Sequence, residues 1–108
     1  MKATADPARV RVEVIQASYE AFRAELETGD AAVAIMINPI TQDNLYLELI
    51  RPMDGGLIYC FGTNDAHEET GVVMNYPNCI VMFKSRTDEL ARMSRRPLGF
   101  DIPPAVED

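Results

Sequence analysis

The sequence predicts an α+β domain: an N-terminal helix, a mostly antiparallel β-meander of four to five strands, a short C-terminal helix and an extended tail. Three observations indicate this class. Asp6-Pro7 is a helix start signal, apolar runs separated by turn residues fill the middle, and an arginine-rich segment ends at Pro97. A chain of 108 residues suits one domain. We therefore expect a single domain over residues 1–97 and a tail over residues 98–108.

The N-terminal helix is predicted to begin at Pro7 and to end before Gly29. Asp is a good N-cap, and proline is favoured in the first turn of a helix. Glycine after the last turn favours the left-handed cap, and three apolar residues fall on one helical stripe, namely Tyr19, Phe22 and Leu26. Residues 9–14 also alternate strictly, as a half-buried strand does. One long helix is the favoured interpretation, and a strand over this stretch is the alternative.

The middle of the chain predicts strands joined by tight turns. Residues 31–37 are apolar and rich in Val and Ile, and residues 44–51 alternate, with Leu45, Leu47 and Leu49 on one face. Asp54-Gly55-Gly56 then predicts a turn, because glycine adopts positive φ without steric cost. Residues 57–61 would return as the partner strand, which makes this hairpin the strongest in the chain.

A second hairpin is predicted across Tyr76-Pro77-Asn78, between residues 72–75 and residues 79–84. Proline fixes a dihedral angle that suits a turn at this position. A helix starting at Pro77 is the alternative, because the apolar residues that follow also fall at helical spacing. The β-branched and aromatic content favours the strand.

The predicted C-terminal helix begins near Ser85, where Ser85 and Asp88 are spaced as in a capping box. Its last turn would contain Arg92, Arg95 and Arg96, which suit the negative end of a helix dipole and could also bind an acidic partner or a phosphate. Pro97 ends the helix. Two consecutive prolines then favour an extended backbone in the tail.

Charge is concentrated in the middle of the chain. Overall, 10 Lys and Arg stand against 17 Asp and Glu, a net charge of −7, which disfavours binding to a nucleic-acid backbone. Residues 24–83 contain nine acidic residues and one basic residue, Arg51, and thus carry −8. This segment suits a partner protein with a basic surface.

Composition and cysteine usage favour a cytoplasmic protein. No apolar stretch of the signal-peptide type follows Met1-Lys2, and the longest nearly uncharged run, residues 31–40, is too short to cross a bilayer. Cys60 and Cys79 are too few for a disulfide framework and lie within apolar runs. We expect two buried thiols and no membrane contact.

The acidic residues at predicted turns are the candidate binding site, and we call five of them the acidic rim: Asp43, Asp54, Asp65, Glu68 and Glu69. Three predicted strands are apolar on both faces, so a further element of the fold, a second copy of the chain or a partner protein is expected to cover the second face. The favoured function is a non-enzymatic protein-binding module, such as an adaptor, immunity or inhibitor protein. Its target could present a basic, nucleic-acid-binding surface, and a homo-oligomer is expected.

The alternative function is a small-ligand-binding domain or a minor enzyme with its site in the polar loop of residues 62–71. His67 lies in this loop, and Cys60 precedes it on the predicted strand, so a nucleophile and base could meet if the loop folded back. No spacing of His, Cys or carboxylates predicts a metal site, and no glycine-rich motif predicts a phosphate-bearing cofactor. We therefore expect neither a metal nor a cofactor.

Overall fold

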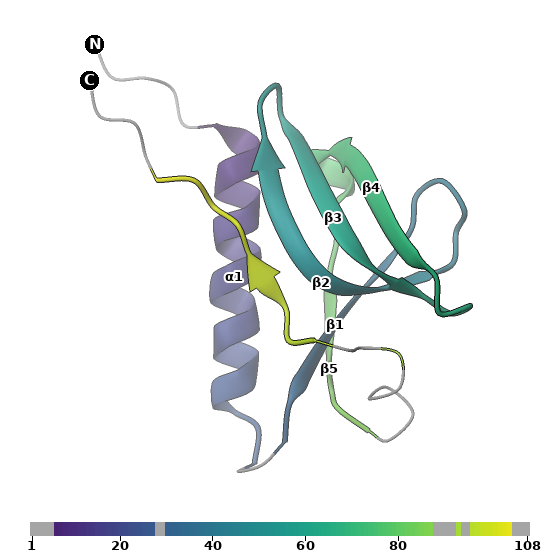
Figure 1. Cartoon of the computed structure of the whole chain (residues 1–108). Coiled ribbons are helices and arrows are strands. Elements are labelled where there is room, and N and C mark those ends of the chain that lie inside the picture. Colours follow the sequence, from purple (N-terminus) through teal and green to yellow (C-terminus); the bar gives the residue numbers. More distant parts are fainter. Residues whose placement is uncertain (1–5, 28–29, 88–92, 94–95, 105–108) are drawn as a thin grey trace.

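The computed structural model describes residues 6–27, 30–87, 93 and 96–104. Within them the order is α1 (Pro7–Ala24), β1 (Ala32–Ile37), β2 (Asn44–Met53), β3 (Leu57–Asn64), β4 (Glu69–Asn75), the 3-10 turn η1 (Tyr76–Asn78), β5 (Met82–Ser85) and β6 (Gly99–Phe100). The helix lies against one side of a bent sheet (Figure 1). The predicted α+β class, with an N-terminal helix and a mostly antiparallel sheet, is confirmed.

Helix α1 begins where the sequence predicts. The Asp6 side chain accepts a hydrogen bond from the Ala8 backbone N–H at 3.0 Å, and Pro7 occupies the first turn. The whole stretch from residue 9 to residue 14 is helical, so the strand alternative is wrong. Four side chains at helical spacing are buried against the sheet: Ala8, Val12, Ile15 and Tyr19. The helical period of 3.6 residues therefore determines which side chains of this segment are buried. Val10 and Val14, two of the alternating apolar residues, are exposed.

The helix ends at Ala24, several residues before the predicted cap. The backbone N–H groups of Glu25 and Leu26 bond to carbonyls three residues earlier, which tightens the last turn. Glu25 and Glu27 also place negative charge at the negative end of the helix dipole, where it disfavours further helix. Gly29, the predicted cap, lies outside the described residues.

The sheet has the strand order β4-β3-β2-β1-β5, with β6 beside β2. The β2–β3 hairpin is confirmed: Met53 pairs with Leu57, and Gly55 and Gly56 have φ of 79° and 77°. Both turn glycines thus use the conformation that disfavours other residues. Strands β1 to β4 form the predicted meander.

The second predicted hairpin is wrong in its pairing. Strand β5 does not return beside β4 but pairs with β1 at the opposite edge, where Ile35 faces Met82. The alternative helix from Pro77 is limited to the single turn η1. Cys79 is fully buried, and Val81 packs against the core. The segment therefore contributes Cys79 and Val81 to the core as it crosses to β1, while Ile80 stays exposed, and it does not reverse direction directly after η1.

The predicted alternation of β2 breaks at Glu48, where the strand has a β-bulge. Leu47 pairs with Gly62 and Leu49 pairs with Phe61, so Glu48 is an extra residue. Ile50 consequently joins Leu45 and Leu47 in the core, while Leu49 turns to the opposite face. The sequence prediction that placed Leu49 with the other two leucines is therefore wrong.

The segment predicted as the start of the tail belongs to the fold. Leu98 is buried, and Ile102 packs against the core. Strand β6 runs parallel to β2, pairing Gly99 with Leu49 and Phe100 with Ile50. This position is open because β1 pairs only with the first residues of β2. The predicted C-terminal helix falls mostly on residues 88–92 and 94–95, which lie outside the described residues.

We predict that Gly62→Ala is strongly destabilising. A Cβ at position 62 would lie 2.1 Å from the carbonyl oxygen of Tyr46, a backbone atom that cannot move without disturbing β2. We expect a loss of more than about 3 kcal/mol in the free energy of unfolding, measured by urea denaturation. Gly71→Ala is the matched control, because its Cβ would meet only the end of the Tyr59 side chain. Equal effects of the two substitutions would contradict this description of the bulge.

Candidate functional site

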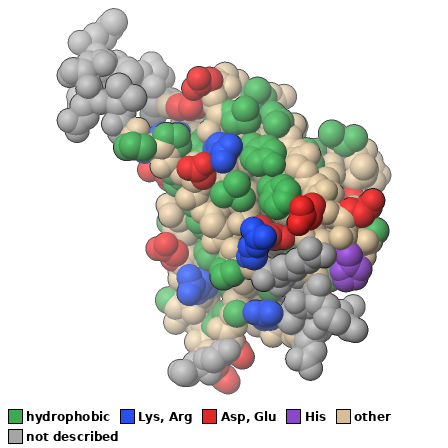
Figure 2. All heavy atoms as spheres, in the orientation of Figure 1, with side chains coloured by type: hydrophobic (Ala, Val, Ile, Leu, Met, Phe, Trp, Pro, Cys, Tyr) green, Lys and Arg blue, Asp and Glu red, His purple; other side chains and the backbone are tan. Residues whose placement is uncertain are grey.

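An apolar surface covers the sheet face that is turned away from α1. The strand register places six side chains on it, which we call the apolar platform: Leu49, Met53, Leu57, Tyr59, Phe61 and Val73. Figure 2 shows hydrophobic side chains gathered on this face, over β2 and β3. Met53 is 38% and Val73 49% exposed, and the other four are half-buried. Aromatic and aliphatic side chains left in this state commonly mark an interaction surface.

Tyr59 lies at the centre of the platform. The guanidinium carbon of Arg51 is 5.7 Å from the centroid of its ring, and Arg51 Nε is 2.7 Å from Asp101 Oδ2. On the other side, its hydroxyl lies over Gly71, which has no Cβ to obstruct it. Tyr59 is thus held between a cation and a bare backbone, which limits the conformational entropy that binding would cost.

A buried carboxylate marks one end of the platform. Glu48, the bulge residue, is only 8% exposed and accepts a hydrogen bond from Thr63 Oγ1 at 2.9 Å. Its second oxygen lies 3.6 Å from Arg96 Nε. Thr63 is fully buried, so this carboxylate satisfies a hydroxyl that has no access to water. The alternation of residues 44–51 does not indicate that Glu48 is buried, because the bulge has no local signal in the sequence.

The structure brings four residues of the acidic rim to the same end of the sheet. Asp43 precedes β2, and Asp65, Glu68 and Glu69 lie in or beside the β3–β4 turn. Leu45 pairs with Asn64, so these two turns are neighbours. Asp54 lies in the β2–β3 turn at the opposite end, so the five residues do not form one continuous group.

Three carboxylates of the rim also hold their turns. Asp65 Oδ1 accepts from the hydroxyl of Tyr46 at 2.9 Å, and Glu68 Oε1 accepts from Asn64 Nδ2 at 3.0 Å. Asp43 accepts a short hydrogen bond from the Thr41 hydroxyl. These side chains therefore have a local structural role as well as a charge that faces solvent.

Cys60 and His67, the alternative site, are not brought together. Cys60 is fully buried on the helix-facing side of β3, whereas His67 is exposed in the β3–β4 turn with φ of 64°. The neighbour of Cys60 is Cys79, with 3.8 Å between the two sulfurs. The hydrogen bond with Cys79, together with burial, raises the pKa of the Cys60 thiol. A thiol in this state is a poor nucleophile.

Comparison of the chain with protein families, with curated proteins and with solved structures finds no match. Within the described residues, no three His, Cys, Asp or Glu side chains are grouped closely enough to hold a metal ion. In that same part of the chain, no helix is long and apolar enough to cross a membrane.

We predict that the two thiols are structural. Cys60→Ala and Cys79→Ala should each lower the free energy of unfolding by about 1–2 kcal/mol, because each removes a small buried group from the core. In the native protein neither thiol should react with a colour-forming disulfide reagent within minutes, while both should react in urea. Rapid labelling of Cys60 in the folded chain would contradict this and would support a reactive site.

We also predict that Glu48 contributes far more to stability than its ion pair suggests. Glu48→Ala leaves the buried hydroxyl of Thr63 without its acceptor and should cost about 1–3 kcal/mol. Arg96→Gln removes only the exposed partner, whose side chain is 74% exposed, and should cost less than about 1 kcal/mol. Urea denaturation of the two variants measures the difference, and a reversed order would show that the ion pair dominates.

Proposed function

We propose that this protein is a non-enzymatic protein-binding module that binds a basic partner protein on the apolar platform and its acidic end. The observation that carries this proposal is the half-exposed platform, because the other part of the same sheet face is covered by the chain itself. There, Val33, Ile35 and Tyr46 are buried, and Met93 packs against them. A partner would cover the corresponding face at β3 and β4.

Charge favours a basic partner over a second copy of this chain. The platform lies within the segment of residues 24–83, whose net charge is −8. Asp65, Glu68 and Glu69 flank one end of the platform, and Asp54 flanks the other. Two copies would bring like charges together, whereas a ring of Lys and Arg around an apolar patch would complement both features. An adaptor or inhibitor that covers such a surface on its target would need this combination.

Affinity capture from a lysate of the source organism, with matched variants, tests the platform. Val73→Lys places a charge in the platform at an exposed position, and Ile80→Lys places the same charge at a site that is 72% exposed and lies in the connection between η1 and β5. The proposal predicts a partner captured by the wild type and by Ile80→Lys but lost with Val73→Lys. Equal capture by all three would contradict it. A dimer of the pure protein in light scattering, abolished by Val73→Lys, would instead assign the platform to a second copy.

The acidic end is tested on the isolated complex. Reversal of Glu68 and Glu69 to Lys should slow association several-fold at about 50 mM salt and much less at about 300 mM, because salt screens steering charges. Reversal of Glu13 and Glu20, on α1, is the charge-matched control and should leave the rate almost unchanged. Association rates that are independent of charge and of salt would remove the acidic rim from the proposal.

A further inference from the structure

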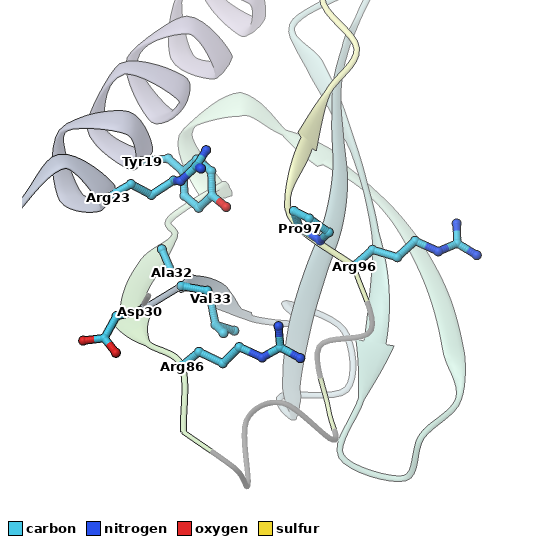
Figure 3. Close-up of a pocket in the computed structure, with 9 residues that line it drawn as sticks. Tyr19, Arg23, Asp30, Ala32, Val33, Arg86, Arg96 and Pro97 are labelled. Atoms are coloured by element: carbon cyan, nitrogen blue, oxygen red, sulfur yellow. The ribbon is translucent and has the colours of Figure 1, made fainter. Parts of the chain in front are cut away.

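A cavity of about 150 Å³ lies between the C-terminal part of α1 and the strands β1 and β5. Segments distant in sequence form its wall (Figure 3). Tyr19 and Arg23 come from α1, and residues 30–33 include the first residues of β1. Arg86 directly follows β5, and Pro97 precedes β6. The cavity lies beside the C-terminal part of α1, and its lining residues differ from those of the apolar platform.

Tyr19 presents an unused hydroxyl to this cavity. The residue is 4% exposed, and its ring packs against Phe83 and Phe100, with centroids 5.6 and 5.9 Å away. Figure 3 shows the hydroxyl directed into the space between Arg86 and Pro97. Among the residues that the structure describes, this hydroxyl makes no hydrogen bond, and since no buried polar side-chain atom there is left without a partner, the hydroxyl is open to the cavity. Because the ring is buried, the hydroxyl is held in one position, from which it can donate a hydrogen bond to a ligand in the cavity.

Two arginines flank the same space. The guanidinium carbon of Arg23 lies 5.6 Å from the centroid of the Tyr19 ring, and Arg86 is anchored by its backbone N–H, which donates to the Ala31 carbonyl at 2.6 Å. Neither guanidinium has a carboxylate within ion-pairing distance in the described part of the chain. In a protein with 17 acidic and 10 basic residues, two such arginines beside one cavity are unexpected.

The remaining charges at the cavity do not neutralise this pair. Asp30 is the acidic residue in its lining, and Figure 3 shows its carboxylate pointing away from the space. Arg96 also lines the cavity, but its guanidinium is directed outward, where it meets Glu48. Arg23, Arg86 and the Tyr19 hydroxyl therefore give the cavity several hydrogen-bond donors and a positive charge.

We propose that this cavity binds a small phosphate group, as inorganic phosphate or as a compact phosphate monoester. Two guanidinium groups offer paired N–H donors and the tyrosine a further O–H donor, a set that matches an anion with acceptor oxygens in several directions. A cavity of about 150 Å³ admits a ligand of roughly the size of benzene, so a phosphate group fits and a whole nucleotide does not. Ala32, Val33 and Pro97 supply apolar walls that weaken competition from water.

Isothermal titration calorimetry of the full chain tests the proposal. The ligands are inorganic phosphate and glycerol phosphate, at about pH 8, where the phosphate group is dianionic. We expect saturable 1:1 binding with a Kd of about 1 mM or tighter for at least one of the two, and the tighter one identifies the source of the phosphate group. Acetate at equal ionic strength should bind at least about tenfold more weakly, since it has two acceptor oxygens in one plane.

Single substitutions locate the binding. Arg86→Gln and Arg23→Gln should each weaken phosphate binding at least about tenfold, and Tyr19→Phe, which keeps the buried ring, should weaken it severalfold. Arg9→Gln is the charge-matched control at the other end of α1 and should leave the Kd unchanged. Thermal unfolding of each variant without phosphate verifies that it is folded. Absence of saturable binding, equal binding of acetate, or equal weakening by Arg9→Gln would overturn the proposal.

Discussion

Between Leu47 and Leu49, β2 has one residue more than the strand it pairs with, and the fold depends on how that residue is accommodated. A bulge bends its strand and increases the local twist. The first residues of β2 remain beside β1, whereas the remainder diverges from β1 and pairs with β6. The sheet thus curves around α1, and the C-terminal segment completes it where β1 leaves an open edge (Figure 1).

Two residues stabilise the bulge, one because it has no side chain and the other through its carboxylate. Gly62 has no side chain, so the backbone of β2 approaches it more closely than any Cβ would allow. Glu48, the extra residue, is almost buried and uses its carboxylate to satisfy the Thr63 hydroxyl. A buried carboxylate is costly unless it is hydrogen-bonded, and the bulge supplies that bond. Because Glu48 is an extra residue, the side chains that follow it lie on the opposite faces of the sheet from those that regular alternation gives. Leu49 therefore lies on the apolar platform and not in the core. The part of the proposed binding surface that β2 contributes, Leu49 and Met53, therefore depends on the irregularity in this strand.

Local sequence signals predicted the elements that depend on neighbouring residues. The Asp6 cap, the two turn glycines and the apolar runs lead to α1, the β2–β3 hairpin and the meander. Features that depend on pairing between segments far apart in the sequence could not be predicted from local patterns. Nothing local indicates that β5 crosses to β1, that residues 99–100 enter the sheet, or that Glu48 is an inserted residue. The residues of the acidic rim lie at predicted turns, whereas their division between two ends of the sheet depends on the strand register. The cavity beside Tyr19 combines four segments and has no signal in any one of them.

Cysteine accessibility at positions 49 and 50 tests the bulge most directly. Leu49→Cys and Ile50→Cys are measured separately with a thiol reagent under native conditions, against the background of the buried Cys60 and Cys79. The bulged register predicts rapid labelling at position 49 and protection at position 50, because Leu49 faces the platform and Ile50 is fully buried. Regular alternation from Leu45 onward would give the reverse order. Protection at position 49 with labelling at position 50 would therefore contradict the bulge and the platform that depends on it.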